Sequence, residues 1–399
     1  MVINLDMYQT LGLATFVLLA GAGLKKNVGF LEKFCIPAPV AGGLLYALLM
    51  YMLHSFGILE FNYDETLKNV CMVIFFTSVG FQANIKILKK GGTSLLIFLI
   101  IVITLVVSQN SVAIGLAKLI GVDMKVGLST GSIPMVGGHG TAGAFGPILE
   151  DFGLKGATTL CTAAATFGLV AGSLMGGPVG QRLIKKHDLL SKIENEDATP
   201  LLNEEIKHQH KAANYAAATY QLAIAMGLGT IISWLLSLTN MTFPVYIGAM
   251  IVAAVMRNIG EMSDKMSDKM TIYIGEINNL GGICLSLFLG IAMITLKLWQ
   301  LADLALPLVL LLVGQTVLMF IFSYFIVFNL MGRDYDAAVL SAGVCGFGMG
   351  ATPNAMANMQ AVTDKYQPSI KAYILVPIIG SMFADFINSL VITMFINFI

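Results

Sequence analysis

The sequence predicts an all-α integral membrane protein of about ten transmembrane helices, arranged as two inverted five-helix repeats that each contain a Gly-rich re-entrant hairpin. Three observations predict this fold: an apolar composition, ten hydrophobic stretches of membrane-crossing length, and an ordered similarity between the two halves. Of 399 residues, 57% are hydrophobic and 12% are charged, about half the charged share of a soluble domain. The formal net charge is zero, which gives no electrostatic basis for binding nucleic acid.

The membrane-crossing stretches are identified by length, because a helix needs roughly 20 mostly apolar residues to cross a bilayer. The ten candidates are 8–25, 36–56, 70–88, 94–120, 156–180, 214–239, 243–257, 277–297, 303–330 and 369–397. Two Gly-rich stretches, 124–150 and 336–360, lie between these spans and are too interrupted for a regular crossing. Asp6 precedes the first span and Lys25 and Lys26 follow it. A cleavable signal peptide has the opposite polarity, so we expect the first helix to be retained.

Basic residues indicate the orientation, because cytoplasmic loops are enriched in Lys and Arg. With both termini outside, 18 of the 23 Lys and Arg residues fall in the inner loops. Five stay outside, namely Lys68, Lys118, Lys125, Lys155 and Lys297. The bias holds only if each Gly-rich stretch enters and leaves the membrane on one side, as a re-entrant hairpin does.

A charged loop at 181–213 divides the chain into an N-terminal repeat, 1–180, and a C-terminal repeat, 214–399. The halves match in order at an offset of 205–216, and the paired positions are Pro39 with Pro244, Gly43 with Gly248, Gly80 with Gly290, Gln109 with Gln315, and Gly168 with Gly380. Five spans in each half force opposite orientations, which is the inverted-repeat plan of secondary transporters. The alternative is that apolar chains resemble one another through composition alone.

The two Gly-rich stretches read GSIPMVGGHGTAGAFGP at 131–147 and GVCGFGMGATPNAMANM at 343–359. Irregular backbone at membrane depth is tolerated only where it is buried in protein or lines a water-filled cavity. We expect Pro134, Pro147 and Pro353 to break helices there. The broken helix N-termini then favour an anion, and free carbonyl groups suit a cation. The alternative is close helix packing through small residues.

The residues at these two tips and in the last span are the candidates for binding substrate or ion. Asp385 is the favoured Na⁺ ligand, since a buried charge in a membrane span is costly and marks a functional position, and Asn388 shares its helical face. His139 is either a hydrogen-bonded tip residue or a proton carrier, and its counterpart in the second stretch is Met349. The candidates are Ser132, Gly137, Gly138, His139, Gly140, Thr141, Gly348, Gly350, Thr352, Asn354, Asp385 and Asn388.

Mid-span polar patches supply the secondary candidates Gln109 and Gln315, with Asn110 beside the first. They either contact a ligand or bridge helices, and Asp385 equally either binds an ion or bonds between helices. No Arg lies deep in a predicted span. A carboxylate substrate would therefore be held by backbone N–H groups and helix dipoles.

Several motifs resemble the bacterial glutamate:sodium symporters along essentially the whole chain: GGHGTAGAFGP, GFGMGATPNAMANM, PAPVAGG and the two five-span halves. The resemblance implies Na⁺-coupled uptake of L-glutamate by alternating access in the inner membrane, with Na⁺ as coupling ion and no cofactor. It also implies a homodimer with an elevator-like transport domain. The 2-hydroxycarboxylate transporters share the paired-hairpin plan, so Na⁺- or H⁺-coupled transport of another organic anion is the alternative.

An intramembrane protease and a channel are the other classes of protein that parts of the sequence suggest. Tyr335-Asp336 imitates one motif of intramembrane aspartyl proteases, but the accompanying GxGD is missing, as are an HExxH helix and a phosphate-binding loop. The sequence therefore predicts no enzyme. Gly-rich re-entrant loops also form channel filters, so a channel is the second alternative.

Overall fold

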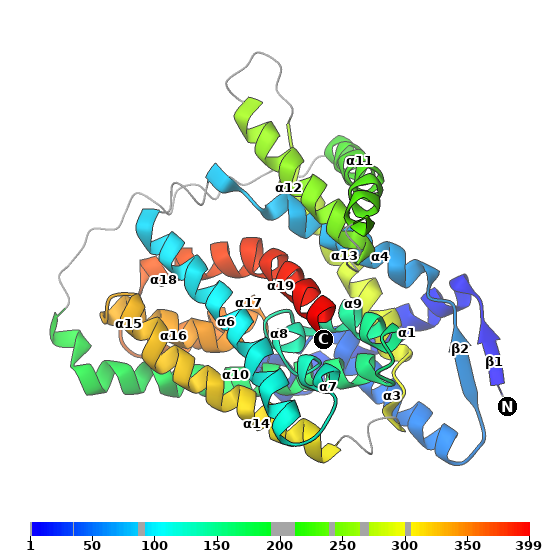
Figure 1. The fold of residues 1–399 in the computed structure, drawn as a ribbon, viewed down its shortest axis with the longest axis horizontal. Coiled ribbons are helices and arrows are strands. Elements are labelled where there is room, and N and C mark those ends of the chain that lie inside the picture. The colour runs from blue at the N-terminus through cyan, green and yellow to red at the C-terminus, as the bar shows by residue number, and fades with distance from the viewer. Residues whose placement is uncertain are drawn as a thin grey trace.

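The computed structural model describes residues 2–34, 36–86, 92–192, 212–238, 244–263, 271–299 and 305–399, and it is almost wholly helical (Figure 1). The first half contains α1 (Met7–Asn27), α2 (Gly29–Lys33), α3 (Ala38–Ser55), α4 (Thr66–Gln82), α6 (Gly92–Leu119), α7 (Met124–Leu128), α8 (Ser132–Met135), α9 (Gly138–Asp151) and α10 (Ala157–His187). A 3₁₀ turn, Leu189–Lys192, follows α10. Residues 193–211, most of the expected linker, lie outside the described residues.

The second half also consists of long helices and a broken segment. It contains α11 (Ala212–Ser237), α12 (Val245–Ser263), α13 (Ile274–Ile294), α14 (Ala305–Ile321), the π-helical segment η4 (Phe322–Val327), α15 (Phe328–Leu330), α16 (Tyr335–Phe347), α17 (Thr352–Thr363), α18 (Ile370–Pro377), the π-helical segment η5 (Ile378–Phe383) and α19 (Ala384–Phe398). Two short parallel strands, β1 (Val2–Leu5) and β2 (Glu60–Tyr63), hold the N-terminus beside the segment between α3 and α4 (Figure 1).

Seven of the described helices are long and apolar enough to cross a membrane. Ile370–Gly380 and Ala384–Phe398 pass the same test only as a pair and meet at a 44° bend, so length and composition indicate seven crossings, or up to eight if this pair is one span. The prediction of an all-helical, multi-pass membrane protein is therefore confirmed. The expected spans 70–88 and 243–257 correspond to α4, which has 17 residues, and α12, whose apolar helix covers only Tyr246–Gly260, so length alone does not establish ten crossings.

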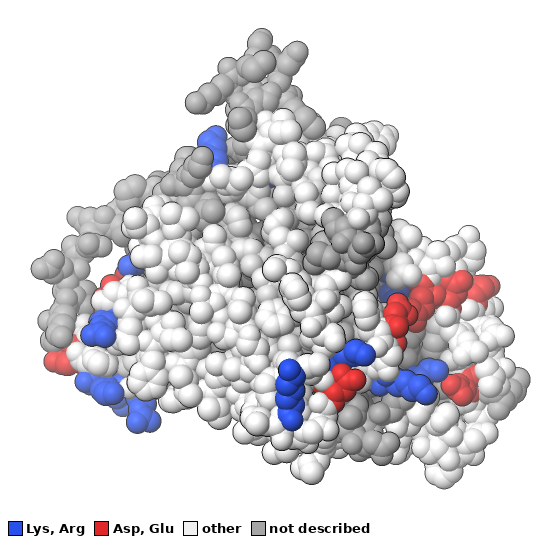
Figure 2. Space-filling model, in the orientation of Figure 1, with Lys and Arg blue, Asp and Glu red and all other residues white. Residues whose placement is uncertain are grey.

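The surface agrees with this interpretation. In the view of Figure 2, charged side chains lie at the left edge, in the lower middle and on the right, and a wide surface above and between them carries no charged side chain among the described residues. Exposed apolar side chains such as Phe16, Leu45, Ile100 and Trp234 belong to the long helices. Such a surface is stable against lipid and not against water.

Each Gly-rich stretch forms a helix, a break and a second helix. In the first, α7 and α8 precede α9, and in the second, α16 packs directly on α17. Pro134 and Pro353 lie at a helix end and a helix start as expected, but Pro147 lies inside α9, which continues to Asp151. A proline removes one backbone hydrogen bond, but α9 continues past Pro147 and packs along α10, where a Cβ atom on Gly146 would lie 2.5 Å from Thr158 Cα.

The helices pack in two groups. The first group consists of α1, α3, α4, α11, α12 and α13, and the second of α6, α10, α14 and α16–α19 with the hairpin α7–α9. The second group contains the largest apolar cluster, which joins α6, α10, α14 and α16 through residues such as Phe98, Val179 and Phe322. The second group also contains both Gly-rich breaks, so the candidate residues are concentrated there.

Glycines allow backbone contact at two corresponding places in the first group. A Cβ atom on Gly42 in α3 would lie 2.0 Å from the Val17 carbonyl oxygen of α1, and a Cβ atom on Gly248 in α12 would lie 2.1 Å from the Gly229 carbonyl oxygen of α11. The comparison of the two halves in sequence pairs Gly248 not with Gly42 but with Gly43, the next residue. Gly43 instead faces Met293 of α13.

The close contact of α1 and α3 makes a prediction for stability. Gly42→Ala should destabilise the protein by about 1–3 kcal/mol, because the added methyl group meets backbone that cannot move aside. Gly23→Ala is the control, since a Cβ atom on Gly23 of α1 meets nothing within 4 Å. The midpoint of thermal unfolding in detergent measures both. Equal midpoints would contradict the close packing.

Candidate functional site

The two glycine breaks meet inside the second group. Gly138, the first residue of α9, has a φ of +57°, and a Cβ atom on it would lie 2.9 Å from the carbonyl oxygen of Gly350, just before α17. Positive φ is nearly free of cost only for glycine. The segments 136–138 and 348–351 are called the first and second tip below. Neither α9 nor α17 has a side-chain cap on its N-terminus in the described structure, whereas α1 and α16 are capped by Asp6 and Asp334.

Two side chains from different helices hold the peptide groups of Ser132, beside the first tip. Asn110 Oδ1 of α6 accepts a hydrogen bond from the Ser132 backbone N–H at 2.8 Å. Asn388 Nδ2 of α19 donates to the Ser132 carbonyl oxygen at 3.0 Å. A Cβ atom on Gly137 would lie 2.8 Å from Asn388 Nδ2 and 2.2 Å from the Thr141 hydroxyl oxygen. Gly137 is therefore a position where no side chain fits.

The second tip is held by the residue next to Asn110. Gln109 Nε2 donates to the Gly348 carbonyl oxygen at 2.6 Å, and Gln315 Nε2 of α14 donates to the Gln109 carbonyl oxygen at 2.9 Å. Consecutive residues of α6 therefore hold the two breaks, Gln109 the second and Asn110 the first.

Helix α10 supports the other side of the second tip. Asn354 Nδ2 of α17 donates to the Leu169 carbonyl oxygen at 3.0 Å and to Ser173 Oγ at 2.7 Å. A Cβ atom on Gly168 would lie 2.2 Å from the Met349 carbonyl oxygen. Because α10 carries a glycine here, its backbone lies directly against the tip.

Several buried polar atoms around the tips have no hydrogen-bond partner among the described residues. The oxygen atoms concerned belong to residues that are fully buried, and they are Gln109 Oε1, Gln315 Oε1, Ser132 Oγ, Asn354 Oδ1 and Asn388 Oδ1. An unpaired buried polar group costs about 1–3 kcal/mol. Oxygen atoms without partners are also the ligands that a hard cation requires, so this chemistry fits Na⁺.

Asp385 lies one turn before Asn388 on α19, as the spacing predicts. Asp385 is half-buried, and no hydrogen bond or ion pair joins it to another described residue. The preceding segment η5 packs against the start of α17, where a Cβ atom on Gly380 would lie 3.2 Å from Thr352 Oγ1. Isolated π-helical turns are frequent at functional sites.

Not every predicted residue faces the tips. His139 Nε2 lies 3.0 Å from Thr166 Oγ1 of α10, so its ring points to that helix. A Cβ atom on Gly140 would face Phe75 and Leu285 of the first group at 3.5 Å. Sequence reasoning missed Leu169 and Ser173 of α10 as supporting residues, and it named Asn110 with Gln109 and Gln315 as polar residues that either contact a ligand or bridge helices.

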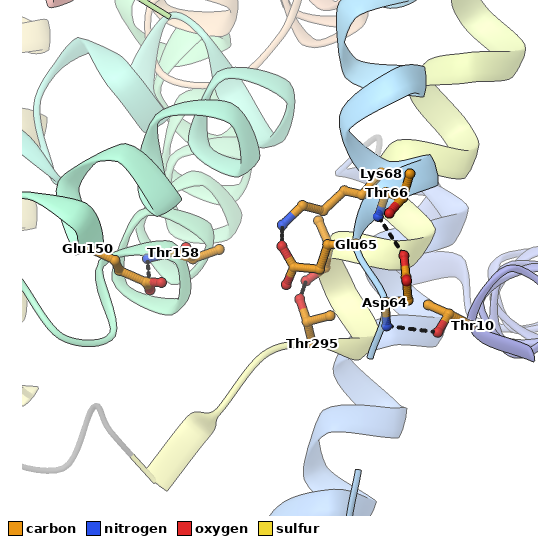
Figure 3. Close-up of polar contacts among 9 residues, drawn as sticks. Thr10, Asp64, Glu65, Thr66, Lys68, Glu150, Thr158 and Thr295 are labelled. Carbon is orange, nitrogen blue, oxygen red and sulfur yellow. Dashed lines mark hydrogen bonds and ion pairs between the residues drawn. The ribbon is translucent and has the colours of Figure 1, made fainter. Parts of the chain in front are cut away.

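A buried cation at the start of α4 is already paired. Lys68, which is 3% exposed at the start of α4, donates to the Glu65 carboxylate (Figure 3). The adjacent Asp64 accepts from the Thr66 backbone N–H at 2.8 Å, and its own N–H donates to Thr10 Oγ1 at 3.3 Å. This cluster therefore fixes the N-terminal end of α4, and its one ammonium group is neutralised.

The helices and the paired tips define a multi-pass integral membrane protein whose polar groups converge in its interior. The sequence profile described as "Sodium/glutamate symporter" matches residues 3–368. The chain is 40% identical to the sodium/glutamate symporter of Escherichia coli K12 over 396 residues, 98% of each chain. It is 37% identical to that of Haemophilus influenzae over 389 residues, 96% of this chain and 95% of the relative. The chain belongs to the sodium/glutamate symporter family, which is a family of transporters.

The double support of Ser132 makes a prediction. Asn110→Ala and Asn388→Ala should each destabilise the protein by about 1–3 kcal/mol, because each leaves a buried backbone group unpaired. Asn27→Ala is the control, since the exposed Asn27 amide bonds only within its own helix. Thermal unfolding measures all three. If the Asn27 variant loses as much as the other two, the tip contacts do not contribute specifically.

Proposed function

We propose that this chain carries L-glutamate and Na⁺ together across the cytoplasmic membrane by alternating access. The observation that carries the proposal is the meeting of the two tips within the second group, where uncapped helix starts and unpaired oxygen atoms are brought together. Membership of the symporter family supports the choice of cargo and coupling ion.

Different groups at the tips bind the anion and the cation. The first N–H groups of a helix have no partner within it and carry partial positive charge. The starts of α9 and α17 therefore bind the carboxylates of glutamate. The unpaired oxygen atoms of Gln109, Ser132 and Asn388, with the Asp385 carboxylate, bind Na⁺. The bound cation in turn neutralises Asp385 beside an anionic substrate.

The two halves form inverted repeats, each with a re-entrant hairpin. The corresponding contacts Gly42 with Val17 and Gly248 with Gly229 support the repeat. Helices α16 and α17, with 13 and 12 residues, rise about 20 Å each, which is less than the roughly 30 Å of hydrocarbon in a bilayer. Hairpins of this length reach the membrane interior and return to the side they entered from.

Transport follows from movement of the second group against the first, in the manner of an elevator. The contact between them at α9 is made by Gly140 and Gly143 against Phe75, Leu285 and Phe288. An apolar contact of this kind has no hydrogen bonds to break when it slides. The first group forms the interface of a homodimer, and both termini lie on the outer side of the inner membrane.

Uptake into proteoliposomes tests the cargo directly. Labelled glutamate should accumulate only with an inward Na⁺ gradient, and unlabelled glutamate should compete better than aspartate, citrate or malate. Preference for a 2-hydroxycarboxylate would favour the alternative carrier. An ohmic current without saturation would favour a channel.

Contact between the tips predicts the effect of a methyl group. Gly138→Ala should lower the rate of Na⁺-driven glutamate uptake at least tenfold, because the added Cβ atom meets Gly350 and φ is positive. Gly153→Ala is the matched control, since Gly153 has a φ of +93° but open space around it. Both variants store backbone strain of about 1–2 kcal/mol, and only the first separates the tips. Equal loss in both would assign the defect to strain.

The unpaired carboxylate predicts a change in sodium dependence. Asp385→Asn should raise the Na⁺ concentration for half-maximal uptake at least tenfold, because the variant lacks the negative charge that balances the ion. Asp151→Asn is the control, since Asp151 is exposed at the end of α9. Uptake is measured across a Na⁺ series at fixed glutamate. An unchanged Na⁺ dependence in the Asp385 variant would remove this residue from the ion site.

A further inference from the structure

We propose that an anionic phospholipid binds on the outside of α10, with an acyl chain in an apolar groove between α10 and α14 and its phosphate against the basic end of α10. This binding site is separate from the tips, and the proposal does not depend on what the protein transports.

The apolar part is a groove of about 540 Å³. Its walls are Phe167, Ala171, Leu174 and Met175 of α10 and Val317 and Phe320 of α14. Leu174 is 57% exposed and Val317 is 52% exposed. The groove is open to the side and apolar, as a lipid chain requires.

The basic part is a second hollow, of about 530 Å³, one helical turn further along α10. It is lined by Pro178, Gln181, Arg182, Lys185 and Lys186. Arg182 and both lysines are exposed. Lys365 of the segment after α17 reaches the same place, where its Nζ donates to Gln181 Oε1 at 3.2 Å. Four cationic side chains therefore surround this hollow.

An aromatic wall connects the two parts. Phe320 stacks on Tyr324 with 5.6 Å between ring centroids, and Lys186 Nζ lies 5.4 Å from the centroid of Tyr324. Met175 and Arg182 are seven residues apart, which is about 10 Å along a helix. A single lipid therefore reaches from the groove to the cations.

Charge decides between the possible occupants. The basic hollow is lined by the end of α10 alone, and clusters of Lys and Arg at the end of a membrane helix attract anionic lipid headgroups. The cationic group of a zwitterionic lipid would be repelled by Arg182, Lys185 and Lys186. A free phosphate ion would use only the basic hollow and leave the apolar groove unfilled. The combination selects an anionic phospholipid.

Such a lipid would contact the helix that supports the second tip. The groove residues Phe167 and Ala171 lie on α10 next to Gly168 and Leu169. Gly168 packs against Met349, and the Leu169 carbonyl oxygen accepts a hydrogen bond from Asn354.

Native mass spectrometry of the detergent-purified full chain tests the proposal, with phosphatidylglycerol and phosphatidylcholine as probes. We expect the chain to retain phosphatidylglycerol at least tenfold better than phosphatidylcholine. Lys185→Gln/Lys186→Gln should reduce that retention about tenfold. The matched control is Lys25→Gln/Lys26→Gln, which also removes two adjacent lysines from the last turn of a helix, and it should retain the lipid normally.

A second variant tests the groove. Leu174→Asn, on an exposed position, should weaken phosphatidylglycerol retention severalfold while gel filtration shows an unchanged fold. Glycerol 3-phosphate, the soluble headgroup, should not displace the lipid at equal concentration. Equal retention of both lipids, an equal loss in the Lys25/Lys26 control, or displacement by glycerol 3-phosphate would each overturn the proposal.

Discussion

The structure depends on one constraint: backbone groups that leave regular helix inside a membrane protein must find partners within the protein. The chain meets it with side-chain amides from neighbouring helices. Asn110 accepts a hydrogen bond from the Ser132 N–H, and Asn388 donates one to the Ser132 carbonyl oxygen. Gln109 donates to the Gly348 carbonyl oxygen. Because these amides use one end of the side chain, their other ends stay unpaired in the same interior. The groups that stabilise the breaks therefore also create the polar surface at which an ion can bind.

The division into two helix groups follows from where small residues lie. Glycines at helix crossings such as α1 with α3 bring backbones into contact and give a rigid packing that does not depend on large side chains. In the second group, glycines lie at helix crossings too, where a Cβ atom on Gly176 of α10 would lie 2.7 Å from the Ala342 carbonyl oxygen of α16, and they also lie at helix ends and at the contact of α10 with the second tip. Glycine therefore has two uses in this protein: within a helix it allows close packing of two backbones, and at a helix end it allows the break.

Much of this arrangement could be predicted from the sequence, because hydrophobic length and Gly–Pro clusters are local signals. The two broken segments were predicted within a few residues. The orientation of His139 toward Thr166 and of Gly140 toward Phe75 could not be predicted, since each depends on which face of α9 meets a distant helix. The expected break at Pro147 is wrong, since α9 continues through this proline to Asp151 and packs along α10, a long-range contact that the local sequence does not show. The partners in α10 gave no signal beyond small residues.

The positions of Gln109 and Asn110 on α6 have a consequence for cargo size. Neighbouring residues on a helix point about 100° apart. The regular geometry of α6 therefore sets the spacing of the two breaks that Gln109 and Asn110 hold. In the proposed function, the cargo binds between these two breaks, so their fixed spacing would limit its length, whereas flexible loops could adjust to cargoes of different lengths. A descendant that accepts a longer molecule would have to change the amides on α6 first, before any glycine at the tips.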